Sequence, residues 1–158
     1  MLVDVTAPTD DVVLPALLRA ARGAYGQAIR TRLEAVGCDD LPRNGLYIIG
    51  GMAGHRGSAG DLIRQLGVSK QAASQLVDTL VVRGYLVREV TPADRRRVAI
   101  DLTERGRAAA AAVREGVQAV DAELSERLSP ADLAGLRAGL VALCDIRDRL
   151  EDETRLSR

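Results

Sequence analysis

The chain has 158 residues, of which 47% are apolar and 28% are charged, so it is long enough for one domain with a real core and too apolar to be disordered. Aromatic residues make up only 2%, which disfavours a protein that stacks single-stranded bases on aromatic side chains. The 22 basic and 22 acidic residues cancel, but residues 56–97 alone carry a net charge of +4, which suggests one face built for a polyanion.

The first third of the chain is predicted to form two helices. Apolar residues recur at spacings of three and four and indicate a helix over roughly 10–36. Its N-cap candidates are Thr9, Asp10 and Asp11. A second helix begins at Leu41–Pro42 and is apolar nearly all round, so we expect it to be buried.

Residues 58–83 are predicted to form a helix, a tight turn at Gly67 and a second helix over 70–83. Ser58-x-x-Asp61 resembles a capping box for the first of them. This pattern is a helix-turn-helix, whose second helix can lie in a DNA major groove. Glutamine pairs with adenine, lysine reaches guanine acceptors, and serine suits bases or phosphates. The candidate DNA-reading side chains are Ser69, Lys70, Gln71, Ser74 and Gln75.

The apolar period then changes from that of a helix to that of a strand. Residues 86–90 and 98–102 are predicted strands, and the turn between them has no apolar anchor. Arginines on such a turn can enter the minor groove of DNA, where the potential is most negative. The candidate DNA contacts of this turn are Asp94, Arg95, Arg96 and Arg97. The alternative is a polar helical corner with a surface arginine cluster that serves solubility.

Two more helices are predicted over roughly 104–127 and from Ser129–Pro130 onward, with a tail after Leu150 that is expected to fray. The apolar seams of the first and the last two helices are longer than a small helix-turn-helix lobe can cover. Exposed seams of this length imply a partner, and a twofold homodimer is the commonest solution. The candidate interface residues are Leu14, Leu17, Leu18, Leu133, Leu136, Leu140 and Leu143. The alternative is a helical bundle within one chain.

Three stretches resemble the MarR family of bacterial winged-helix transcription regulators. They are DLIRQLGVSKQAASQLVDTL at 61–80, RGYLVR at 83–88 and DRRRVAIDLTERG at 94–106, of which the last is the most specific. The resemblance extends over about residues 10–150. By position, Arg96 is similar to the family's minor-groove arginine, and Asp94 to the residue that holds it.

The resemblance implies a mainly α fold with a small β-hairpin, as one MarR-like domain over 1–158. A winged helix-turn-helix DNA-binding lobe is expected over about 40–102, and a helical dimerisation lobe over about 10–36 and 104–150. The implied function is a transcriptional regulator, expected to be a ligand-responsive repressor. It would bind a pseudo-palindromic double-stranded DNA operator as a homodimer. Members of the family often bind a small phenolic or lipophilic effector between the two lobes. Tyr25, Tyr47 and Arg22 are candidates to line that space, and the sequence assigns none of them to it.

Two alternatives with the same fold remain open, a winged helix used for protein interaction and a thiol-based redox sensor. For the second, Cys38 lies beyond the first helix, whereas some related sensors carry a cysteine near its start, and Cys144 lies near the apolar seam of the last helix. An enzyme is disfavoured because His55 has no acid–base partner nearby in sequence, and no phosphate loop, metal spacing or nucleophile elbow occurs. We therefore expect no cofactor and no metal. With two cysteines, no CxxC and no apolar run of ~18 to 20 residues, we expect a cytoplasmic protein without a membrane partner.

Overall fold

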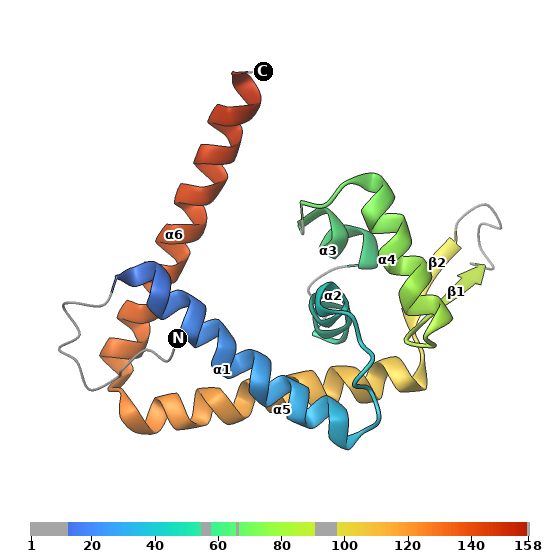
Figure 1. Cartoon of the computed structure of the whole chain (residues 1–158), viewed down its shortest axis with the longest axis horizontal. Coiled ribbons are helices and arrows are strands. Elements are labelled where there is room, and N and C mark those ends of the chain that lie inside the picture. The colour runs from blue at the N-terminus through green and yellow to red at the C-terminus, as the bar shows by residue number, and fades with distance from the viewer. Residues whose placement is uncertain (1–12, 55–57, 66, 91–97, 158) are drawn as a thin grey trace. The chain divides into compact units, whose positions relative to one another are not determined.

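A computed structural model of the protein describes residues 13–54, 58–65, 67–90 and 98–157 (Figure 1). The chain divides into two compact units, Met1–Val120 and Asp121–Arg158. Within the described residues, no helix is long and apolar enough to cross a membrane. The elements of the first unit run in the order α1 (Leu14–Ala35), α2 (Arg43–Ala53), α3 (Ala59–Gln65), α4 (Lys70–Val82), β1 (Leu86–Val90), β2 (Val98–Leu102) and the first part of α5 (Glu104–Arg127).

The first helix begins later than the sequence predicted. Helix α1 starts at Leu14, and its N-cap residue Val13 makes no side-chain capping bond. A proline lies in the first turn, where its missing N–H costs no hydrogen bond. The predicted cap residues 9–11 lie outside the described part of the chain, and α2 likewise begins one residue after Pro42, which is its N-cap.

The helix-turn-helix and the hairpin form as predicted. Ser58 and Asp61 cap α3 reciprocally, because the Ser58 N–H donates to the Asp61 carboxylate (3.0 Å) and the Asp61 N–H donates to the Ser58 hydroxyl (3.2 Å). Gly67 turns the chain with φ +65°, a conformation that other residues rarely adopt. Strands β1 and β2 pair antiparallel, with Leu86 opposite Leu102. The Ser69 hydroxyl then accepts the Ala72 N–H and starts α4.

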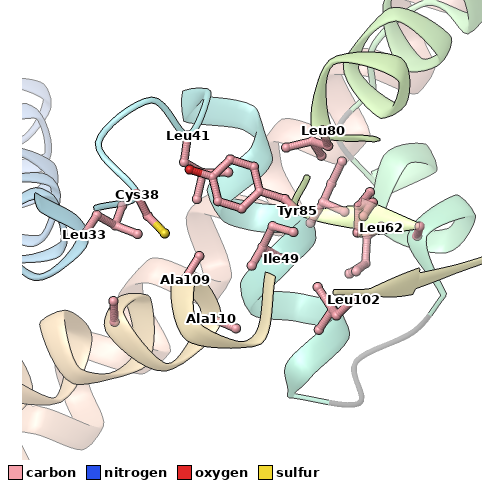
Figure 2. Packing of buried hydrophobic residues seen from close by; sticks show 14 residues of the cluster. Leu33, Cys38, Leu41, Ile49, Leu62, Leu80, Tyr85, Leu102, Ala109 and Ala110 are labelled. Atoms are coloured by element: carbon pink, nitrogen blue, oxygen red, sulfur yellow. The ribbon is translucent and has the colours of Figure 1, made fainter. Parts of the chain in front are cut away.

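The core of the first unit lies where α2, α3, α4, the hairpin and the start of α5 meet (Figure 2). The largest fully buried side chains are Tyr85, Ile48, Ile49, Leu62, Leu80 and Leu86. The alanine run of α5 contributes Ala109, Ala110 and Ala112, whose small side chains let the helix approach closely. Helix α2 is buried only in part, since its Tyr47 is 43% exposed.

The second unit holds α6 (Pro130–Leu156) and the end of α5. The Ser129 hydroxyl accepts the Asp132 N–H at 3.2 Å, so the predicted cap of α6 is confirmed. The expectation that the tail after Leu150 frays is wrong, because the helix continues to Leu156. An Arg147–Glu151 pair at i,i+4 spacing and good helix formers support its last turns.

Glycine at position 116 lets α1 and α5 touch through their backbones. A Cβ at Gly116 would lie 2.6 Å from Cα of Ile29, closer than real Cβ atoms come. A helix backbone cannot give way as a flexible side chain does, so any larger residue must push the two helices apart.

Gly116→Ala is therefore expected to lower the free energy of unfolding by about 1–3 kcal/mol, as overpacking a tight contact does. Gly23→Ala is the control, because a Cβ there meets nothing within 4 Å and should cost nothing. Urea unfolding of both variants checks this, and equal stability of the two would contradict the close approach.

Candidate nucleic-acid interface

The predicted reading residues of α4 lie on its exposed side. Ser69, Lys70, Gln71, Ser74 and Gln75 are all exposed, whereas Val77 and Leu80 on the other side are buried. The Ser69 hydroxyl is already used as the helix cap. The helix thus presents polar donors and acceptors outward, at the N-terminal end that such helices insert into a major groove.

The predicted wing contacts Asp94, Arg95, Arg96 and Arg97 lie outside the described residues. What the structure describes is the hairpin that carries them, up to the pairing of Val90 with Val98. The roles of the four residues at its tip therefore stay predictions.

An ionic junction of Asp40, Arg83 and Arg105 connects the C-terminal end of α4 to the rest of the first unit. Arg105, in the first turn of α5, donates to Asp40 (2.9 Å), to the carbonyl of Gly37 (3.1 Å) and to the carbonyl of Arg83 (2.5 Å). Its guanidinium also lies 4.5 Å from the ring centre of Tyr85. Arg83, the C-cap of α4, donates to the carbonyl of Asp40.

The buried hydroxyl of Tyr85 donates to the Asp40 carboxylate. This bond, together with the charges of Arg105 and Arg83, holds the pKa of Asp40 below its ordinary value of 3.8. Burial and the same hydrogen bond raise the pKa of Tyr85 above its ordinary value. The carboxylate form of Asp40 and the neutral form of Tyr85 therefore stabilise each other.

A pocket of about 730 Å³ lies between α1 and α2. It brings together the three residues that the sequence offered as effector contacts, Arg22, Tyr25 and Tyr47. The other polar side chains of its wall are Arg19, Arg30, Arg43, Asn44 and Asp39. The described residues of the wall thus include four arginines and one acid, so the wall is rich in positive charge.

The two cysteines lie in different surroundings. Cys38 is buried in the core beside the junction (Figure 2), with its thiol 3.7 Å from the carbonyl of Val36. Cys144, on α6, is exposed. A buried thiol is less open to oxidants than the exposed thiols of redox sensors.

Within the described part of the chain, no group of three or more His, Cys, Asp or Glu residues could hold a metal ion.

Known proteins resemble this chain in sequence over most of its length. The model of the MarR family matches residues 40–97. A transcriptional regulatory protein for the hcr operon of Thauera aromatica is 30% identical over 138 residues, which span 87% of this chain and 80% of that relative. The chain belongs to the MarR family. It is thus a member of a family of DNA-binding transcriptional regulators.

Solved structures agree with the fold. The DNA complex of S. aureus MepR has a TM-score of 0.66 at 20% identity, over 85% of this chain and 98% of that one. RV1404 from Mycobacterium tuberculosis has a TM-score of 0.59 at 25% identity, over 89% and 95%. MepR bound to ethidium bromide has a TM-score of 0.58 at 20% identity, over 87% and 98%. The predicted fold, mainly helical with a two-stranded hairpin in a winged helix, is confirmed.

The sequence did not reveal the junction of this MarR-family chain. Tyr85 and Arg105 lie inside two of the stretches that resemble the family, but Asp40 lies outside all three. Nothing in the spacing of 45 residues from Asp40 to Tyr85, or of 65 to Arg105, brings them together. An acid in a loop beside a buried tyrosine is visible only in the folded chain.

The junction predicts how stability depends on pH. Since the pKa of Asp40 is lowered on folding, its contribution is present above pH 3.8 and is lost as the pH falls through the folded-state value. Asp40→Asn should reduce stability at pH 7 and flatten the loss of stability below about pH 4. Denaturant unfolding at several pH values measures this. Asp39→Asn, on the exposed neighbour, is the matched control, and an unchanged acid limb in Asp40→Asn would refute the assignment.

Proposed function

We propose that this chain is a sequence-specific regulator that binds a pseudo-palindromic double-stranded DNA operator as a homodimer and represses transcription until an effector binds. The observation that carries the proposal is the polar face of α4, which stands clear of the core at the end of a capped helix-turn-helix, beside a hairpin with an arginine-rich turn. Helix and hairpin turn together suit the major groove and the neighbouring minor groove.

The exposed leucines of α6 support the homodimer. Leu136, Leu140 and Leu143 recur along one helix at spacings of three and four and are 39–43% exposed. Leu14 at the start of α1 is 64% exposed, while Leu17, Leu18 and Leu133 are half-buried. An apolar stripe of this kind is covered by a second copy in most oligomers, with the same patch on both subunits.

The pocket between α1 and α2 supports an effector. S. aureus MepR is seen with the cation ethidium, whereas the wall here carries four arginines against one acid among its described residues. Of the phenolic and lipophilic effectors expected for the family, the wall favours aromatic anions such as phenolic carboxylates. Such a ligand acts on DNA binding only as far as it prefers one of the two conformations of the protein.

The proposed minor-groove contact of the hairpin turn and the proposed major-groove contact of α4 predict different effects of mutation on DNA binding. Arg96→Ala should weaken binding to every duplex and reduce the slope of log affinity against log salt by about one, because one phosphate-region contact is lost. Gln71→Ala or Gln75→Ala should cost about 1–3 kcal/mol and relax preference at particular base pairs. Footprinting on DNA flanking the coding region supplies the operator, and anisotropy titrations at several salt concentrations measure the effects. Identical behaviour of the two classes, or a monomer in sedimentation at micromolar concentration, contradicts the proposal.

The arginine-rich wall predicts charge selectivity in the pocket. 2-Hydroxybenzoate should bind more tightly than its uncharged amide 2-hydroxybenzamide, and ethidium should bind weakly. Arg22→Ala and Arg43→Ala should each reduce carboxylate binding by a factor of about ten, the cost of one charge-assisted hydrogen bond. Calorimetry measures this, with Arg114→Ala as the control, because Arg114 is exposed on α5 outside the pocket wall. Equal binding of carboxylate and amide would exclude an anion site.

A further inference from the structure

One ion pair joins α4, the helix proposed to enter the major groove, to the hairpin. Nη2 of Arg88, on β1, lies 2.5 Å from Oδ1 of Asp78, on α4. The Arg88 side chain is 47% exposed and that of Asp78 is 52% exposed. The pair therefore lies at the surface, where a simple ion pair contributes little to stability.

Asp78 lies on the side of α4 that is proposed to read DNA. It follows Gln71 by seven residues, Ser74 by four and Gln75 by three, and these spacings place the four side chains on one face of a helix. A carboxylate on such a face repels the phosphates of a bound duplex. An acid is unfavourable there unless it serves the DNA contact in another way.

Arg88 is placed to serve that contact. Strand alternation puts it on the same side of β1 as the buried Leu86, which turns its side chain toward the helices and away from the side of Glu89. Among the described residues, Asp78 takes one Nη2 bond of a guanidinium that has five N–H donors. The remaining donors form a fork that suits a phosphate.

The position of the pair relates it to the DNA backbone. Helix α4 is proposed to enter the major groove, and the hairpin turn the neighbouring minor groove. The sugar–phosphate strand that separates these two grooves must pass between the helix and the hairpin. A side chain that bridges α4 and β1 on the DNA-facing side thus lies against that strand.

We propose that Arg88 contacts the phosphate backbone between the two grooves and that Asp78 is the positioning residue that aims its guanidinium. The inference rests on the proposed DNA-binding function and adds two residues to it. Asp78 acts only through Arg88, so its loss weakens DNA binding although it removes a negative charge from the DNA-facing surface.

Anisotropy titrations of the full chain test this on the footprinted operator and on a duplex of unrelated sequence, at several salt concentrations. Arg88→Ala should weaken binding to both duplexes by the same factor, roughly fivefold at 0.15 M salt, and lower the salt slope by about one. Asp78→Asn should also weaken binding several-fold. Arg114→Ala, which removes the same charge from α5, should leave both quantities unchanged.

The sign of the Asp78→Asn effect is decisive. If the carboxylate merely repels DNA, its removal tightens binding, and tighter or unchanged binding overturns the proposal. The reversed pair, Asp78→Arg with Arg88→Asp, separates a structural tie from a phosphate contact. If the pair is only a structural tie between α4 and β1, the reversed pair restores the wild-type DNA affinity and salt slope, and this result overturns the proposal. If Arg88 contacts a phosphate from β1, the salt slope of the reversed pair stays reduced.

The remaining outcomes separate this inference from the function on which it rests. A wild-type chain that prefers the operator, with an unchanged salt slope in Arg88→Ala, refutes the phosphate contact and leaves the proposed function standing. A wild-type chain that binds neither duplex refutes both. Thermal unfolding of each variant, with Glu123→Gln in the exposed Arg127–Glu123 pair as reference, shows that the variants are folded.

Discussion

The buried ring of Tyr85 is the constraint on which the first unit depends. A phenol with no exposed surface must find a partner for its hydroxyl, and the carboxylate of Asp40, in the loop between α1 and α2, accepts its hydrogen bond. Arg105 then compensates the charge of that carboxylate and covers the ring. The backbone of Tyr85 is held as well, since its carbonyl accepts the N–H of Thr103 at 3.1 Å. One aromatic residue thus fixes the end of α4, the start of β1 and the start of α5.

The same loop belongs to the wall of the α1–α2 pocket. Asp39 and Leu41, which flank Asp40, both line it, and so does Leu33 at the end of α1. The pocket wall therefore includes both neighbours of the residue that bonds Tyr85 and Arg83. Asp40, which lies between two residues of the pocket wall, thus contacts Arg83, the C-cap of α4.

The positive charges of the chain fall into two groups, one in the segment with α4 and the hairpin and one around the pocket. The net charge of zero conceals a cationic middle segment, and that segment holds both the α4 face and the hairpin turn. Among the described residues of α4, the one acid is Asp78, and it is paired with Arg88. Four arginines of α1 and α2 instead line the pocket, namely Arg19, Arg22, Arg30 and Arg43. The molecule thus separates cations proposed for a polyanion from cations proposed for a small anion.

The sequence alone determined the elements whose signals are local. The strand bounds 86–90, the Ser69 and Ser129 caps and the helix over 104–127 follow from periodicity and from side chains that bond within three or four residues. The three stretches that resemble the MarR family were sufficient to predict the fold and the family. The tertiary structure decided what depends on distant partners, namely the junction of Asp40 with Tyr85 and Arg105 and the gathering of Arg22, Tyr25 and Tyr47 around one pocket. Those contacts arise because burying Tyr85 forces separate segments together, and no spacing along the chain records which segments they are.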